Sequence, residues 1–229
     1  LSGVPVAAET VALHTLFELV RSTRVRLHVC RISSAAAVRL VAAAKAEGLP
    51  ITCDVSINNL LLTDTDIGYF DSRMRLDPPL RQQHDRQALG QALKDGVIDA
   101  LVSDHTPVKD DEKALPFAQA EPGASGLELL LGLACKWGQS QGLDLPQVLS
   151  RLSCHPARVL GSALGSLQGS CGHLRVGGVA DLCVFDPAAE WTVEPQTMRS
   201  RGRHTPFEGH ALPVQVRWTL VGGRIAYEG

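Results

Sequence analysis

The feature that most restricts the fold of this chain is the alternation of helical and strand patterns in its first half. Apolar positions recur at helical spacing in three segments, at residues 6–20, 35–47 and 85–94. Short apolar runs typical of β-strands lie between and after them, at residues 24–32, 50–55 and 98–103. Strands that alternate with helices of about ten or more residues favour parallel pairing. The sequence therefore predicts an α/β fold with a parallel sheet.

This predicted sheet is incomplete on its own. Three parallel strands cannot close a barrel, and an isolated three-stranded sheet leaves N–H and C=O groups unpaired along its edges. The first residues also resemble the interior of a domain and carry no start signal. We therefore expect the chain to be the C-terminal part of a longer chain or of a larger assembly.

The pattern changes in the second half of the chain. Helical segments are predicted first, at residues 127–137, 146–152 and 156–160. Glycine-rich turns and short β runs follow from Gly172 onward, at residues 181–185 and 214–225. Two domains are expected, with residues 1–164 forming the α/β part and residues 165–229 forming a β-rich flanking domain.

Composition and charge exclude several classes of protein. The 22 Lys and Arg residues nearly balance the 24 Asp and Glu residues, for a net charge of −2, so bulk charge does not favour nucleic acid. No apolar run approaches the roughly 18 to 20 residues that span a bilayer, and no secretion signal is visible. A cytoplasmic protein with neither a nucleic-acid nor a membrane partner is expected.

The cysteines do not indicate a structural zinc module. They are far apart and none forms a C-x-x-C pair: Cys30, Cys53, Cys135, Cys154, Cys171 and Cys183. Most lie in apolar stretches, where a reduced thiol packs as a small hydrophobic group. We expect them mainly to fill the core.

A series of short motifs follows the predicted strands. Residues 27–33 read LHVCRIS, residues 52–56 read TCDVS and residues 77–81 read DPPLR. Residues 94–99 read KDGVID, and SDHTP follows at 103–107. In this order and at these separations they resemble the HVCHVS, TAEVT, NPPLR, DGTID and TDHAP motifs of type I dihydroorotases, in the amidohydrolase superfamily. The tail resembles the small β-domain of that superfamily, through GGVADL at 177–182 and TPF at 205–207.

The resemblance implies a partial TIM-type (β/α) barrel with a zinc site at its strand ends, beside part of a β-sandwich built from both chain termini. Family members form or hydrolyse the cyclic amide of dihydroorotate in pyrimidine synthesis. Their metal activates a water molecule, and a carboxylate transfers the proton. The first ligands of the family, an HxH pair, a bridging acidic residue and a further His, would lie upstream of Leu1.

Two metal-site positions of the family fall inside this chain. Asp104 matches the aspartate that serves as metal ligand and general base. Arg31 replaces the second His of HVCHVS, and a guanidinium has five donors and no lone pair for a cation. No zinc is therefore expected at this site, although zinc is the cofactor of active members. An ion pair of Arg31 with Asp104 would fill the same space.

The substrate positions implied by the resemblance are also largely substituted. Asp77 replaces the Asn of NPPLR, and a carboxylate there is adverse to an anionic substrate. Val108 replaces a His, residues 58–59 read Asn-Asn where the family has a His pair, and Pro122 replaces a Phe. Only Gly123 agrees with the family. The losses indicate that the fold has been kept without its chemistry.

Simpler interpretations apply to several of these residues. His28 is expected to be a hydrogen-bonded core histidine rather than a metal ligand. The Asp104-His105 pair could cap a helix, and Asp77 could belong to a rigid turn before two prolines. The charged run at 109–113 is expected to be a solvated loop.

Three functions remain open at this stage. The first is a non-catalytic homologue that binds aspartate carbamoyltransferase, as inactive dihydroorotase homologues of some bacteria do; self-association is also considered. The second is an active zinc-dependent dihydroorotase that cyclises N-carbamoyl-aspartate with ligands from upstream. The third is a binder of another small metabolite in the old pocket. Whether the chain is part of an enzyme is thus left open.

Overall fold

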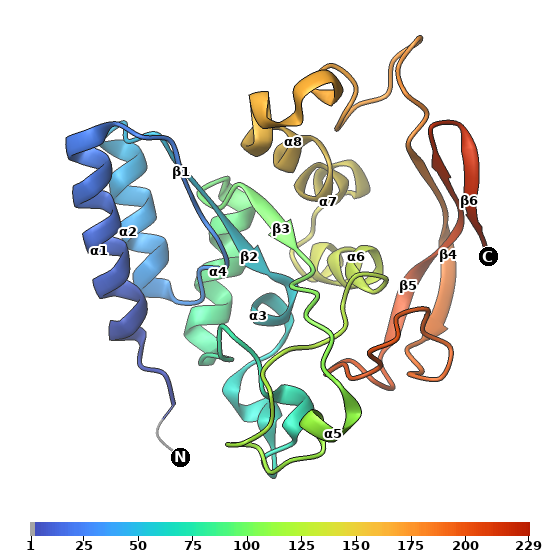
Figure 1. Ribbon diagram of the computed structural model, residues 1–229, viewed down its shortest axis with the longest axis horizontal. Coiled ribbons are helices and arrows are strands. Elements are labelled where there is room, and N and C mark those ends of the chain that lie inside the picture. Colours follow the sequence, from blue (N-terminus) through green and yellow to red (C-terminus); the bar gives the residue numbers. More distant parts are fainter. Residues whose placement is uncertain (1–2) are drawn as a thin grey trace.

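The computed structural model describes residues 3–229. The expectation that the first residues resemble the interior of a domain therefore lies partly outside the described residues, at Leu1 and Ser2. The first half of the chain forms a parallel sheet with helices against it (Figure 1). Its strands are β1 Leu27–Val29, β2 Ile51–Ser56 and β3 Ala100–Val102. Its main helices are α1 Val6–Thr23, α2 Ala35–Ala46 and α4 Gln83–Asp95. The predicted alternation is confirmed.

The strand order is β1-β2-β3, and both pairs are parallel, as predicted. The first strand is shorter than expected. Helix α1 runs to Thr23 and ends at Arg24 in the left-handed region (φ 57°), while Arg31 at the other end also has a positive φ of 58°. Such residues interrupt extended backbone, so only part of the run at 24–32 pairs. The carboxyl ends of all three strands meet at one edge of the sheet.

Local sequence signals explain where the helices begin and end. The Ser34 hydroxyl accepts a hydrogen bond from the Ala37 amide at 3.1 Å and caps α2. Gly96 ends α4 in the left-handed region, at φ 80°. The inner side of α1 buries Leu13, Phe17 and Val20, which are spaced for one face of a helix.

Four short helical segments in the connections of the parallel sheet were not predicted. They are α3 Ile57–Leu61, α5 Asp110–Lys113 and two 3-10 helices, Asp64–Ile67 and Ser72–Met74. All lie in connections that carry the motif residues. Because each has five residues or fewer, none has enough length to show a hydrophobic period in the sequence.

The second half contains helices and then an antiparallel sheet (Figure 1). The helices are α6 Leu130–Ser140, α7 Leu145–Leu152, α8 Cys154–Leu160 and the 3-10 segment Gly161–Leu167. The strands, in the order β4-β5-β6, are β4 Leu182–Thr192, β5 Ala211–Val221 and β6 Arg224–Glu228. The single β run predicted at 214–225 is in fact a hairpin that turns at Gly222 and Gly223, both at positive φ. A Gly-Gly pair between strands is a hairpin signal.

One hydrophobic core joins the two halves. Val55 on β2 and Leu89 on α4 belong to the same buried cluster as Leu133, Phe207 and Leu212 from the second half. Helix α6 lies directly against β5, where Gly132 leaves room: a Cβ there would lie 3.1 Å from that of Leu212. The division at residue 165 stays a prediction. Within residues 3–229, no helix is long and apolar enough to cross a membrane.

The cysteines are only partly in the core. Cys53 and Cys135 are buried, as expected for small apolar fillers. Cys30 and Cys183 are exposed, so the expectation was wrong for these two. Cys30 directly follows β1 and Cys183 lies in β4, whose residues are largely exposed.

Candidate active site

The predicted site residues gather at the carboxyl edge of the parallel sheet. Arg31 follows β1, Asp54 lies near the end of β2 and Asp104 follows β3. Arg31 and Asp104 both have positive φ, 58° and 51°, which turns the chain sharply beyond each strand. Non-glycine residues in this region carry a conformational cost and are common at functional sites.

The central contact of the site is an ion pair between Arg31 and Asp104. Arg31 Nη1 donates to Asp104 Oδ1 at 2.8 Å and to the main-chain oxygen of Asp77 at 2.9 Å. The Asp104 side chain is 7% exposed and that of Arg31 is 39% exposed. The hydrogen bond to Asp104 raises the pKa of Arg31 above its ordinary value. The pairing considered from the sequence is thus present.

This arrangement does not fit the zinc ion that the resemblance implies. A zinc ligand at position 31 would need a lone pair, and a guanidinium has none. The Arg31 side chain also occupies Oδ1 of Asp104, the residue that the resemblance matches to a family metal ligand. The Asp104 carboxylate therefore holds the positive charge of Arg31 in the position where a divalent cation would have to bind.

A cavity of about 310 Å³ opens beside the ion pair. Its lining consists of Arg31, Leu76, Asp77, Asp104, Thr106, Glu121, Pro122, Gly123 and Ala124. The structure therefore brings together Arg31, Asp77, Asp104, Pro122 and Gly123, as expected. Gly123 has φ 141°, and a Cβ there would lie 2.5 Å from the Thr106 oxygen, so this position requires glycine.

Two of the positions that the resemblance assigns to the substrate site have structural roles here. Val108 is 6% exposed and is not part of the cavity lining. Asn59 is buried, and its amide donates to the main-chain oxygen of Pro79 at 3.0 Å, which ties α3 to the DPPLR segment. Its Oδ1 atom is buried without a hydrogen-bond partner in the described part of the chain.

Lys113 is a residue that sequence reasoning placed wrongly. The run at 109–113 was expected to be a solvated loop, but Lys113 is only 1% exposed. Its Nζ donates to the main-chain oxygens of Arg75, Glu121 and Gly123, at 3.0, 2.9 and 2.8 Å. Burial, with the nearby charge of Arg75, lowers the pKa of Lys113 to about 8. The ammonium joins two loops that form the cavity wall.

His28 and His105 have hydrogen-bonded roles. His28 Nδ1 lies 2.8 Å from Thr52 Oγ1 and Nε2 lies 2.9 Å from Asp54 Oδ2, so the expected hydrogen bonding is confirmed. The side chain is 28% exposed, so His28 does not lie in the core as expected. The other Asp54 oxygen accepts the Arg31 amide at 2.7 Å. His105 Nδ1 accepts the amides of Gly126 and Leu127, which supports the loop that leads to α6.

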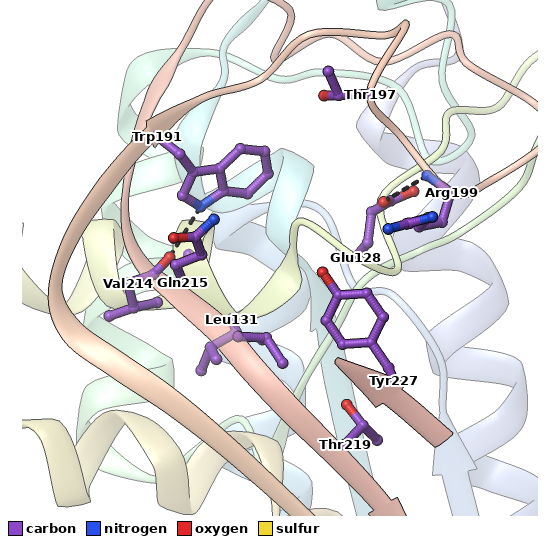
Figure 2. A pocket seen from close by; sticks show the side chains of 11 residues that line it. Glu128, Leu131, Trp191, Thr197, Arg199, Val214, Gln215, Thr219 and Tyr227 are labelled. Carbon is purple, nitrogen blue, oxygen red and sulfur yellow. Dashed lines mark hydrogen bonds between the residues drawn. The ribbon is translucent and has the colours of Figure 1, made fainter. Parts of the chain in front are cut away.

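Another cavity, of about 390 Å³, lies between α6 and the antiparallel sheet (Figure 2). Trp191 forms one wall, with its Nε1 donating to the Val214 oxygen at 2.9 Å. The Glu128 carboxylate accepts the amides of Arg199 and Ser200 at 2.9 and 3.0 Å, and the Arg199 guanidinium lies 5.6 Å from the ring centre of Tyr227. Sequence reasoning assigned none of these residues. The cavity shares no residue with the one beside Arg31.

Comparisons with known proteins agree on one family. The sequence model described as "Amidohydrolase family" matches residues 6–227. A dihydroorotase-like protein of Pseudomonas aeruginosa is 46% identical over 229 residues, which is all of this chain and 52% of that protein. A dihydroorotase of Geobacter metallireducens is 36% identical over 228 residues, with the same shares. The chain spans about half the length of the curated relatives it matches.

Several similar solved structures are hydantoinases. A D-hydantoinase (dihydropyrimidinase) from Thermus sp. has a TM-score of 0.88 and 27% identity, over 98% of this chain and 49% of that one. An L-hydantoinase from Arthrobacter aurescens has a TM-score of 0.87 and 29% identity, with the same coverage. The expected fold class is confirmed: part of a TIM-type barrel beside a small sheet. The chain belongs to the amidohydrolase family, among its dihydroorotase-like members.

Proposed function

We propose that this chain is part of a dihydroorotase-like protein that no longer catalyses the reaction and serves as a structural partner of aspartate carbamoyltransferase. The observation that carries the loss of catalysis is the 2.8 Å contact of Arg31 Nη1 with Asp104 Oδ1. A fold can be retained after its pocket has lost catalytic activity if another part of its surface binds a partner.

Electrostatics support the loss of the family zinc site. A divalent ion about 4 Å from a guanidinium is repelled by on the order of 8 kcal/mol at an effective dielectric constant of about 20. The Arg31 charge is permanent, since its pKa is raised further by Asp104. Zinc bound through Asp104 would first have to break the ion pair and then overcome this repulsion.

The cavity wall also opposes an anionic substrate. Asp77 and Glu121 both line it, and the single cation of the lining, Arg31, is already paired with Asp104. Carbamoyl-aspartate carries carboxylates, so its entry would bring like charges together. This charge pattern supports a pocket that no longer takes the family substrate.

An exposed apolar side of α1 supports a protein partner. Val11 and Leu19 lie on one side of this helix and are 65% and 55% exposed. This surface involves neither Arg31 nor Asp104. Binding there would be unaffected by the changes in the pocket.

The partner is tested by joint purification and analytical ultracentrifugation with aspartate carbamoyltransferase from the same organism. A joint particle larger than either protein is expected. The double variant Val11→Lys, Leu19→Lys should weaken it, while the control Arg31→Met should leave association unchanged. Two proteins that sediment separately at micromolar concentrations would contradict the proposed partnership.

The loss of catalysis is tested by dihydroorotate turnover together with metal analysis. No turnover is expected, and Asp104→Asn should leave the zinc content unchanged. Arg31→His alone should not restore turnover, because Asp77 and Val108 remain. Turnover accompanied by zinc that is lost in Asp104→Asn would overturn the proposal.

A second candidate is an active dihydroorotase with ligands supplied from upstream. It is favoured by relatives named dihydroorotase at 36% identity and by the retained, largely buried Asp104. The upstream sequence separates the two candidates. An intact HxH pair and bridging residue there favour the enzyme, and further substitutions favour the structural partner.

A further inference from the structure

A separate group of metal-ligating side chains lies at the ends of β1 and β2. His28, Cys30 and Asp54 each offer a ligand atom, and these atoms all lie within 4.8 Å of one another. We propose that these three residues bind one thiophilic divalent cation, such as Zn²⁺. The site would be distinct from the family position that Arg31 has closed, and it goes beyond the proposed function.

Strand geometry explains why the three side chains converge. Residues two apart on extended backbone point to the same face, so His28 and Cys30 share a side of β1. In the parallel register, Thr52 lies opposite His28. Asp54 follows two residues later on the same side of β2. The four side chains therefore form a compact group on neighbouring strands.

His28 and Asp54 are each oriented by a hydrogen bond to the side-chain atom that would not bind the metal. Thr52 Oγ1 holds Nδ1 of His28 at 2.8 Å, and the Arg31 amide holds Oδ1 of Asp54 at 2.7 Å. The remaining atoms, His28 Nε2 and Asp54 Oδ2, face each other at 2.9 Å. Supporting contacts of this kind orient metal ligands in proteins. A threonine hydroxyl donates or accepts, so it can hold either histidine tautomer when a metal takes Nε2.

The ligand chemistry suits zinc. Imidazole, thiolate and carboxylate bind Zn²⁺ at about 2.0 to 2.3 Å, which separates tetrahedral ligand atoms by about 3.3 to 3.6 Å. The His28–Asp54 contact would therefore open slightly and Cys30 would move in. His28 and Asp54 also line a cavity of about 480 Å³, from which water can take the fourth position.

The charges of the group favour a cation. Asp54 and the Cys30 thiolate together neutralise a divalent ion, and binding releases the thiol proton to solvent. The Arg31 guanidinium is directed to Asp104 and the Asp77 oxygen. Arg31 donates its main-chain amide to Asp54, and its charge acts also on the neighbouring Cys30, whose pKa is raised mainly by burial.

The proposal is tested by titrating the metal-free full chain with Co²⁺ and competing with Zn²⁺. One equivalent is expected to bind, with the near-ultraviolet absorption of a thiolate–Co²⁺ bond. That absorption should vanish in Cys30→Ser and persist in the matched control Cys183→Ser, which removes another exposed cysteine. Affinity should fall about 10- to 100-fold in Asp54→Asn and about tenfold in Thr52→Val, a positioning residue. Circular dichroism checks that each variant is folded.

Three outcomes would overturn the proposal: no thiolate absorption, absorption that survives Cys30→Ser, or binding that depends on Asp104 instead. The last would also contradict the loss of the family zinc site. Binding that depends on Cys30 but not on Asp104 supports the new site, and a separate turnover assay decides the proposed function.

Discussion

At the scale of single residues, the buried charged side chains of the site are all paired with a charged or polar partner. Asp104 is nearly buried and its charge is met by Arg31, while the Lys113 ammonium has three carbonyl partners. A buried charge that loses its partner costs more than the pair contributes. A variant that removes one member of such a pair should therefore lower the free energy of unfolding, because the other member is left buried and unpaired.

The ion pair can be measured with a double-mutant cycle. Arg31→Met should lower the free energy of unfolding by about 1 to 2 kcal/mol, because it leaves Asp104 without its partner; the exposure of Arg31 keeps the loss moderate. In combination with Asp104→Asn, the loss should be about 1 kcal/mol smaller than the two separate losses together. Urea denaturation measures all four proteins. Strict additivity would show that the contact contributes nothing to stability.

Lys113 should give stability a distinctive pH dependence. Its pKa is about 8 in the folded protein against the ordinary lysine value of 10.5, so between these values the unfolded chain binds more protons. The contribution of Lys113 to the free energy of unfolding is constant below about pH 8. It then rises with pH up to about 10.5, by on the order of 3 kcal/mol.

Lys113→Met removes this pH-dependent contribution to the free energy of unfolding. The stability difference between wild type and variant, measured by urea denaturation from pH 7 to 10.5, should grow with pH. A difference that stays constant over this range would show that the pKa of Lys113 is not lowered by burial.

At the scale of elements, Glu128 connects the start of α6 to the loop between β4 and β5. Its carboxylate accepts the amide of Arg199 (Figure 2) and also that of Ser200. Glu128→Gln should lower stability by about 1 kcal/mol, since hydrogen bonds to a charged acceptor are lost. Amide hydrogen exchange at Arg199 and Ser200 should quicken. Glu190→Gln, on exposed strand surface, is the control, and equal effects of the two variants would argue against a connecting role.

The elements that could be predicted from the sequence are those with a local signal. Helical spacing identified α1, α2, α4 and α6, and alternation with helices predicted the parallel pairing. The end of β1 and the turn of the β5–β6 hairpin were misplaced, because backbone reversals at Arg31 and Gly222 divide continuous apolar runs. The short helices of the connections gave no period to detect.

The site was predictable only in part, for a similar reason. Motif spacing brought Arg31, Asp77 and Asp104 together, and the structure confirms their proximity. The role of Lys113 depends on carbonyl oxygens up to 38 residues away, which no local pattern reveals. His28 was correctly predicted to be hydrogen-bonded. Its closeness to Cys30 and Asp54 depends on the register of β1 and β2, which could not be predicted from the sequence.

At the scale of the whole molecule, the shared core predicts that the described chain unfolds as one unit. Phe207 lies in the second half, is 1% exposed and belongs to the same cluster as Val55 on β2. Phe207→Ala should cost about 3 to 5 kcal/mol and shift one common transition. Fluorescence and far-ultraviolet circular dichroism should therefore coincide. Two separate transitions would instead indicate independent domains on either side of residue 165.

The contact of Arg31 with Asp104 also has a consequence for descent. Replacement of Arg31 leaves the nearly buried Asp104 carboxylate without its partner, so drift at this position meets a folding penalty. Under the proposed loss of catalysis, a return of activity through Arg31 would therefore pass through a less stable protein. Selection for folding alone would then preserve the pair.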